Sequence, residues 1–160
     1  MTFEEIYNKI SDIIQMNQAE ARKLYDCAKS LPENAVVVEI GTYQGGSAMV
    51  MAAAINGMVY TIDNDPKFET KILDNILLIK GTSEEATLAW DKPIDMLFID
   101  GSHFYADVAK DIINWVPKVK DGGIVCFHDY GSHVDVSVAV NEALLHRVGF
   151  SDNSLLAIIK

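Results

Sequence analysis

The sequence predicts an α/β fold of the Rossmann-like, doubly wound kind, with a mostly parallel sheet, helices on both faces and an abbreviated C-terminal strand pair. Two observations favour this architecture. Short apolar runs rich in β-branched residues recur along the chain, as expected for strands that are covered on both faces. Helix-like stretches fill the gaps between these runs, and such alternation is typical of a parallel sheet.

The elements follow one another in a regular order. Apolar residues from Phe3 to Cys27 recur at helical spacing, which predicts one or two amphipathic helices ahead of the sheet. We expect strands at 36–40, 58–62, 76–79, 96–99 and 124–127, and helices at 47–56, 66–74, 83–90, 105–116 and 135–147. The turn at 121–123 leads into the fifth strand, and the tail at 154–159 pairs with residues near 148–150. These elements predict one domain over 1–160, with N-terminal helices at 1–34 and a Rossmann-like core at 35–160.

The composition argues against several classes of protein. Hydrophobic residues make up 49% and charged residues 22%, which is typical of a globular domain and not of a disordered chain. The net charge of −10 disfavours binding to nucleic acid or to an anionic membrane. No apolar run approaches the ~18 residues that span a bilayer, and neither a signal peptide nor a disulfide framework is evident. We therefore expect a soluble, cytoplasmic protein.

Unusual residues gather at the expected carboxyl ends of the strands, where open parallel sheets bind ligands. A glycine-rich loop at 41–47 follows the first strand and leads into a helix, whose N-terminus offers free N–H groups. Asp63 closes the second strand, 22 residues after Gly41, where a carboxylate can accept the hydroxyls of a ribose. Thr82 and Ser83 follow the third strand, where an adenine edge is commonly bound. Together these residues favour an adenosine-containing ligand, although Asp63 alone is also explained as a turn residue that caps a helix.

The loop departs from the dinucleotide pattern. Gln44 stands where a pyrophosphate-binding loop requires another glycine, which argues against NAD. Glu39, near the end of the first strand, would repel a diphosphate but suits a ligand that carries positive charge.

Three segments resemble a known family. Residues 37–47 are similar to the first motif of the class I S-adenosylmethionine-dependent methyltransferases. Residues 98–103 and 122–130 resemble the small-molecule O-methyltransferase branch that includes macrocin O-methyltransferase and the proteins named cephalosporin hydroxylases. The resemblance covers about residues 31 to 147. It implies that S-adenosylmethionine is the cofactor, and the cofactor-binding residues that it implies are Glu39, Gly41, Thr42, Tyr43, Gly45, Ser47, Asp63, Thr82, Ser83 and Asp100.

Methyl transfer to a hydroxyl needs alignment of the two reactants and removal of a proton, by a general base or with the help of a divalent ion. Asp100, His128 and Asp129 close the fourth and fifth strands, so they are candidate metal ligands. Mg²⁺ is expected first, and the imidazole leaves Mn²⁺ or another transition ion open. The metal-dependent catechol-type relatives usually have Asp, Asp and Asn at these places, so His128 departs from their pattern. The alternative is that these side chains only hydrogen-bond loops at the sheet edge.

His103 lies three residues beyond Asp100, where the catechol-type relatives have a lysine base. An imidazole with a pKa near ~6.5 can take a proton at neutral pH, so we predict His103 as the general base and Asp100 as a second catalytic residue. The alternative role for His103 is to cap the following helix. His133 follows the fifth strand and could contact the substrate, but it is explained most simply as an exposed loop residue.

The resulting prediction is an S-adenosylmethionine-dependent methyltransferase that acts on a small hydroxylated acceptor with divalent-metal assistance. The alternatives are an NAD-dependent oxidoreductase and a non-catalytic adenosine-binding protein on the same fold. The long insertions that usually form an acceptor pocket are not evident between the strands. Either the acceptor site is open or a second subunit completes it, and we therefore expect a homodimer.

Overall fold

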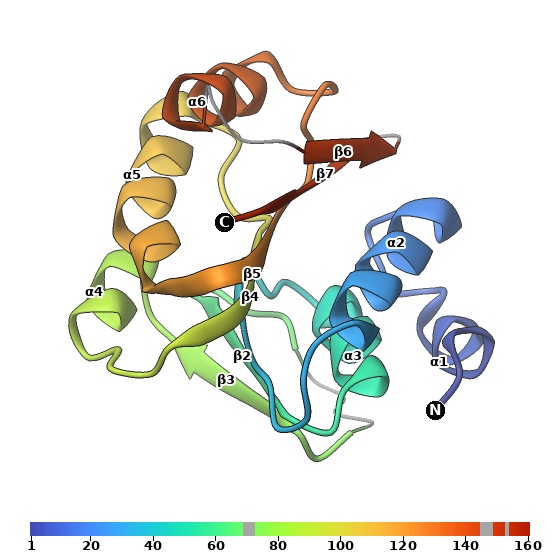
Figure 1. Cartoon of the computed structure of the whole chain (residues 1–160). Helices are drawn as coiled ribbons and strands as arrows, with labels where there is room; N and C mark the ends of the chain where they lie inside the picture. The colour runs from blue at the N-terminus through green and yellow to red at the C-terminus, as the bar shows by residue number, and fades with distance from the viewer. Residues whose placement is uncertain (69–72, 145–148, 153) are drawn as a thin grey trace.

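The computed structural model describes residues 1–68, 73–144, 149–152 and 154–160. It contains a seven-stranded sheet in the order β3-β2-β1-β4-β5-β7-β6 (Figure 1). The strands are β1 (Val36–Ile40), β2 (Met58–Asp63), β3 (Ile76–Lys80), β4 (Ile94–Ile99), β5 (Val119–Phe127), β6 (Gly149–Asp152) and β7 (Leu155–Ile159). Strands β1 to β5 pair in parallel, whereas β7 is antiparallel to both β5 and β6. The predicted Rossmann-like fold with a C-terminal strand pair is therefore confirmed.

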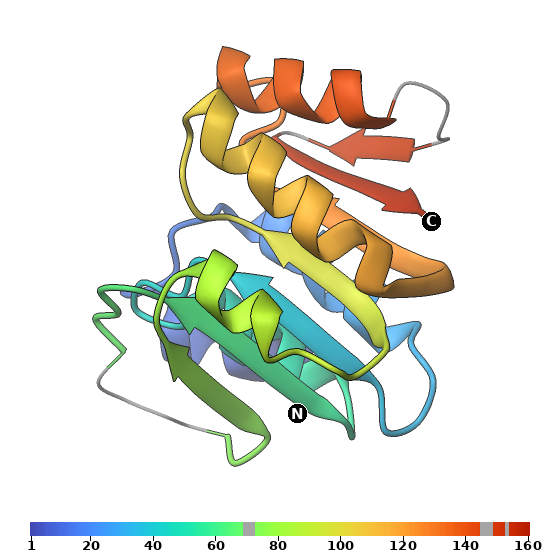
Figure 2. The ribbon, with the colours of Figure 1, turned by 90° about the vertical axis from the view of Figure 1, so that its left-hand side faces the viewer.

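Helices cover both faces of the sheet. The helices are α1 (Phe3–Ile10), α2 (Gln18–Lys29), α3 (Gly46–Ala54), α4 (Ser83–Leu88), α5 (Tyr105–Trp115) and α6 (Val134–Leu144), and a 3₁₀ turn at Val116–Lys118 follows α5. Helices α1 to α3 lie on one face, and α4 to α6 lie on the other, in front of the sheet in Figure 2. The strand order reverses between β1 and β4, and this is the place where sheets of this kind bind ligands.

Three helices begin with a capping box, in which the N-cap side chain and the third helical residue each accept a backbone N–H. The pairs are Thr2 with Glu5 in α1, Asn17 with Glu20 in α2 and Thr82 with Glu85 in α4. These short polar motifs fix where the helices start. They also use side chains, such as that of Thr82, that the sequence suggested for the cofactor.

Two apolar layers hold the sheet. On one face, α3 is buried along nearly its whole length, because its alanine and methionine side chains pack between the sheet and helices α1 and α2. On the other face, fully buried Trp115 and Phe127 pack with side chains of α5 and α6. Burying one large apolar side chain contributes about 1.5–3 kcal/mol, so these two layers contribute much of the stability of the fold.

The structure differs from the sequence predictions in two places. Strand β5 begins at Val119 instead of 124, so the segment 121–123 lies within the strand, where the β4–β5 register shifts and Gly122 has a φ of 79°. In the predicted helix 66–74, residues 66–68 and 73–74 are not helical, and residues 69–72 lie outside the described part of the chain. Residues 145–147 of the last predicted helix also lie outside it.

The two cysteines are brought together by the fold. Cys27 on α2 and Cys126 on β5 are both buried and free, and their thiols are hydrogen-bonded. Within the described ranges, none of the helices combines the length and the apolar character needed to cross a membrane.

Candidate active site

Two adjoining cavities open at the carboxyl ends of the parallel strands. The first cavity, of about 510 Å³, runs from the β1–α3 loop to the start of α4 and includes Asp63, Thr82 and Ser83. The second cavity, of about 420 Å³, lies toward β5 and includes His103, His128 and Asp129. They share Gly41, Tyr43, Asp100 and Gly101. Two ligands held in these cavities would therefore meet beside Asp100.

The β1–α3 loop needs glycine at two positions. Gly41 has a φ of 95°, and a Cβ atom there would lie 2.1 Å from the carbonyl oxygen of Asp100. Gly45, the N-cap of α3, has a φ of 82°, and its Cβ would lie 2.5 Å from the ring of Phe68. Because L-residues avoid positive φ and both sites are crowded, only glycine allows this path. The loop therefore lies tightly against β4 and borders both cavities.

Glu39 lies beneath this loop and lines neither cavity. Its carboxyl group is fully buried and is hydrogen-bonded by Ser47 Oγ and by Thr61 Oγ1, which lies 2.6 Å from Thr42 Oγ1. Burial raises the pKa of Glu39 to about 8, although both hydrogen bonds oppose the shift. At neutral pH the side chain is therefore mostly uncharged. The structure gives Glu39, Thr42 and Ser47 a role in holding the loop, with only Thr42 and Ser47 reaching the second cavity.

Asp63 connects the first cavity to the loop. Its Oδ2 accepts the backbone N–H groups of Thr42 and Tyr43, both at 2.9 Å, and its Oδ1 accepts that of Asp65 at 2.8 Å. A carboxylate has about four acceptor positions, so roughly one is left for a ligand hydroxyl. Asp63 thus closes its own turn, as part of the alternative interpretation expected, and also borders the cavity. The helix that it was expected to cap is not seen at residues 66–68.

The far end of the first cavity holds a carboxyl group that the sequence patterns did not identify. Thr82 caps α4, and Ser83 Oγ donates a hydrogen bond of 2.5 Å to Asp111 of α5. Burial raises the pKa of Asp111 to about 6, against the opposing hydrogen bond from Ser83. Asp111 lines the cavity together with Thr82 and Ser83. Its signal in the sequence was only a polar residue on a helix, which gives no indication of a site.

The second cavity is lined by a largely buried histidine, which lies among three carboxylates. His128 Nδ1 lies 3.2 Å from both Asp100 Oδ1 and Asp129 Oδ2, and His128 Nε2 lies 3.5 Å from Glu20 Oε2. Burial alone lowers the pKa of His128, but the hydrogen bond to Asp100 and the charges of all three carboxylates raise it to about 9. Burial also raises the pKa of Asp100. The three predicted metal ligands are therefore together, with their ligand atoms within 4.8 Å of one another.

Glu20 belongs to this cluster although it was not predicted. It is 4% exposed, it completes the capping box of α2, and its Oε1 accepts hydrogen bonds from the backbone and side chain of Ser154. The capping-box spacing in the sequence predicts the role of Glu20 at the start of α2. It does not predict the contact with His128. The connection between α1 and α2 also reaches the site, because Ile13, Gln15 and Met16 line the second cavity.

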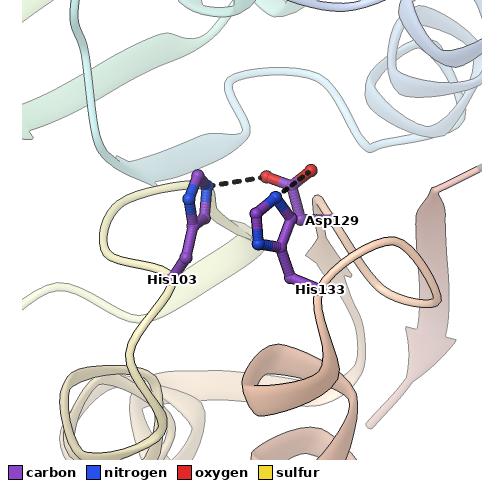
Figure 3. Close-up of side chains that lie close together, drawn as sticks. All are labelled: His103, Asp129 and His133. Carbon is purple, nitrogen blue, oxygen red and sulfur yellow. Dashed lines mark ion pairs between the residues drawn. The ribbon is translucent and has the colours of Figure 1, made fainter.

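His103 lies at the mouth of the second cavity. Its Nε2 is 2.8 Å from Asp129 Oδ2, and its ring stacks on that of His133 with centroids 4.2 Å apart (Figure 3). The positive charge on His128 lowers the pKa of Asp129 against the effect of burial, and Ser132 and His103 act in the same direction. An ionised Asp129 can therefore orient the His103 imidazole.

Comparisons with known proteins agree with this geometry. The family model described as "Methyltransferase domain" (Methyltransf_24) matches residues 38–130. A curated relative, "Uncharacterized protein y4gI" of Sinorhizobium fredii (strain NBRC 101917 / NGR234), is 43% identical over 53 residues, which are 33% of this chain and 6% of that protein. The chain thus spans a small part of that relative.

Two solved structures have similar folds at low identity. The O-methyltransferase NovP matches with a TM-score of 0.76 and 15% identity, over 92% of this chain and 81% of NovP. The methyltransferase MycE of the mycinamycin pathway, solved with Mg, SAH and mycinamycin VI, matches with a TM-score of 0.70 and 17% identity, over 99% of this chain and 54% of MycE. At these identities the likeness concerns the fold. Because the family model matches more than half of the chain, this protein belongs to the methyltransferase domain family, and it has the fold of the class I S-adenosylmethionine-dependent methyltransferases.

Proposed function

We propose that the protein transfers the methyl group of S-adenosylmethionine to a hydroxyl group of a small acceptor. The observation that supports this proposal best is the meeting of the two cavities beside Asp100. A methyl donor in one cavity and an acceptor in the other would have their reacting ends adjacent. Such alignment supplies much of the rate enhancement in an in-line displacement.

The first cavity suits the cofactor. Its volume lies within the roughly 300–1,000 Å³ of typical small-molecule sites. The unused acceptor position of Asp63 is available to a ribose hydroxyl, and Ser83 and Asp111 border the place where the adenine would lie. The methionine part would then extend toward Asp100, beside the second cavity.

His103 is proposed as the general base. Asp129 faces Nε2 of His103, which favours the proton on that nitrogen and leaves the lone pair on Nδ1. The acceptor hydroxyl would give its proton to Nδ1 as its oxygen bonds the methyl carbon and the sulfonium sulfur leaves. The negative charge of Asp129 stabilises the imidazolium that forms, so Asp129 is proposed as a positioning residue.

The donor set of Asp100, His128 and Asp129 fits a divalent ion, because two carboxylates and one imidazole converge there. We propose Mg²⁺ as the first ion to test, with Mn²⁺ as the ion that the imidazole ligand suits better. When bound, the ion would act as a Lewis acid that lowers the pKa of the acceptor hydroxyl. The ion and the proton on His128 Nδ1 compete for one nitrogen. Undiminished turnover in the presence of a chelator would contradict metal assistance.

A calorimetric titration with S-adenosylhomocysteine tests the cofactor, with NADH as the comparison ligand. We expect micromolar binding of the first ligand alone, weakened by about tenfold or more in Asp63→Asn because a charge-assisted hydrogen bond is lost. Asp65→Asn is the matched control, because the Asp65 side chain is 77% exposed and lines neither cavity. Tighter binding of NADH would favour an oxidoreductase. Binding without methylation of any hydroxylated acceptor would favour a non-catalytic adenosine-binding protein.

We also propose that the protein forms a homodimer. Exposed apolar side chains on neighbouring helices α4 and α5, Leu88 at 88% and Ile113 at 69% exposed, offer a surface for a second copy. Sedimentation at working concentration tests the proposal, and a monomeric profile would contradict it.

A further inference from the structure

His103, Asp129 and His133 form a second group of ligand atoms at the mouth of the second cavity. His103 Nε2 lies 2.8 Å from Asp129 Oδ2, and His133 Nε2 lies 3.8 Å from Asp129 Oδ1 (Figure 3). The ligand atoms of the three side chains lie within 4.8 Å of one another. We propose that these side chains bind a transition-metal ion of the Zn²⁺ class, and that the bound ion inhibits methyl transfer. The inhibitory part rests on the proposed function, whereas the site itself does not.

The donor types decide the class of ion. Two imidazoles and one carboxylate suit Zn²⁺, Co²⁺ or Ni²⁺, whereas Mg²⁺ and Ca²⁺ prefer oxygen ligands. Three protein ligands are the usual number at a zinc site that keeps a position open for water or another ligand. The rings of His103 and His133 are half-exposed, at 50% and 46%, so they can rotate until both nitrogens face one ion. Rotation of the two rings would bring their nitrogens to the roughly 2.0–2.1 Å that Zn–N bonds require.

The backbone around the group is already ordered. Asp129 and His133 lie in one tight turn, in which the carbonyl oxygen of Asp129 accepts the backbone N–H of His133 at 2.9 Å. The loop that holds His103 is tied to the same region, because the backbone N–H of Tyr105 donates to Asp135 and the Tyr105 hydroxyl donates to Glu142. The N-terminal end of α5 is thereby joined to both the first and the last turn of α6. The distance between the two histidines is therefore held by hydrogen bonds outside the metal group.

This group is distinct from Asp100, His128 and Asp129, although both contain Asp129. The His128 ring is only 10% exposed and is enclosed by carboxylates, whereas His103 and His133 open to solvent. An ion on Nε2 of His103 would displace the proton from that nitrogen, and the neutral imidazole would then hold its proton on Nδ1. His103 would lose the lone pair that the proposed reaction needs, and so the ion would inhibit.

Calorimetric titration of the full chain with ZnCl₂, without cofactor, tests the site. We expect one tight site in the parent protein, weakened at least tenfold in His133→Ala. Two controls should keep the parent affinity: His146→Ala, which removes the remaining histidine of the sequence, and Asp100→Asn, which alters only the other group. Any binding of MgCl₂ should be the same in the parent protein and in His133→Ala. Unchanged zinc affinity in His133→Ala, or its loss in Asp100→Asn, would overturn the assignment.

Two further measurements test the site with readouts other than calorimetry. The visible absorption of bound Co²⁺ should show nitrogen ligation in the parent protein and lose intensity in His133→Ala. If the methyl-transfer assay succeeds, Zn²⁺ should inhibit the parent. The rate of His133→Ala, taken relative to its own rate without zinc, should resist inhibition at least tenfold better. Zinc binding that leaves the rate unchanged would overturn the inhibitory role. Failure to find any methyl transfer would leave the two binding measurements decisive for the site.

Discussion

Replacing the buried carboxyl group of Glu39 by an amide should change how the stability of the protein depends on pH. The pKa of Glu39 is raised from 4.5 to about 8, and each pKa unit corresponds to about 1.4 kcal/mol. Between these two values the unfolded chain releases the proton while the folded chain keeps it. The free energy of unfolding of the parent therefore falls as the pH rises from 4.5 to 8, by roughly 3 kcal/mol between pH 5 and pH 7.5.

Glu39→Gln removes this titration and keeps the shape of the side chain. The amide oxygen can accept from Ser47, and the amide nitrogen can donate to the hydroxyl of Thr61. Relative to the parent, the variant should gain roughly 3 kcal/mol between pH 5 and pH 7.5, which corresponds to a relative rise in Tm of roughly 6–12 °C for a chain of this size. Above pH 8 the difference should stay constant.

Thermal and urea unfolding of both proteins across this pH range would measure the difference. Glu33→Gln is the matched control, because the Glu33 side chain is exposed and should leave the slope unchanged. If Glu39→Gln and the parent showed parallel curves from pH 5 to pH 8, Glu39 would be ionised throughout. The account of the loop as resting on an uncharged carboxyl group would then be wrong.

Three further predictions concern the site. Gly41→Ala should lower the free energy of unfolding by at least about 2 kcal/mol, because the added Cβ would collide with Asp100. Gly122→Ala should cost less, since Gly122 also has a positive φ, of 79°, but no atom lies within 4 Å of its added Cβ. Equal losses in calorimetry would contradict the collision with Asp100. His103→Ala should lower kcat by about 10²–10⁴-fold with unchanged affinity for S-adenosylhomocysteine, and a rate within a few-fold of the parent would refute its role as base. The pKa of His128 is raised from 6.5 to about 9, so its contribution of roughly 3 kcal/mol is fully present below pH 6.5 and is lost as the pH rises through 9. His128→Gln should therefore destabilise most at low pH, and a pH-independent loss in urea unfolding would count against this.

The local patterns of the sequence predicted the fold well because each buried strand is a continuous apolar run. The start of β5 was missed for a physical reason. The glycines of the segment 121–123 are typical of a turn, but here they accommodate a register shift within the strand, and only the pairing with β4 distinguishes the two. Gly41 and Asp63 were predicted as neighbours in one site, and the hydrogen bonds from the loop to Asp63 show how they are joined.

Other residues of the site could not be found in the same way. Glu20 and Asp111 lie on helices that the fold brings to the cavities from distant parts of the sequence. The local sequence explains Glu20 as part of a helix cap and Asp111 as part of a polar helix face. It does not indicate that either side chain contacts a residue of the site. His133 was interpreted as an exposed loop residue, and its stacking on His103 depends on the tight turn after Asp129.

The contacts of Glu20 couple three separate parts of the chain, so that binding of a ligand beside His128 should stabilise all three. This carboxylate joins the first turn of α2, the hairpin at Ser154 and the imidazole of His128. A ligand that binds only to the arrangement with His128 in place must also stabilise that arrangement, by RT ln(1 + [L]/Kd). Amide hydrogens of α2 should then exchange more slowly when the cavities are filled. No residue of α2 lines either cavity; only the loop before the helix does. Hydrogen exchange in α2 would thus report when the second cavity is occupied.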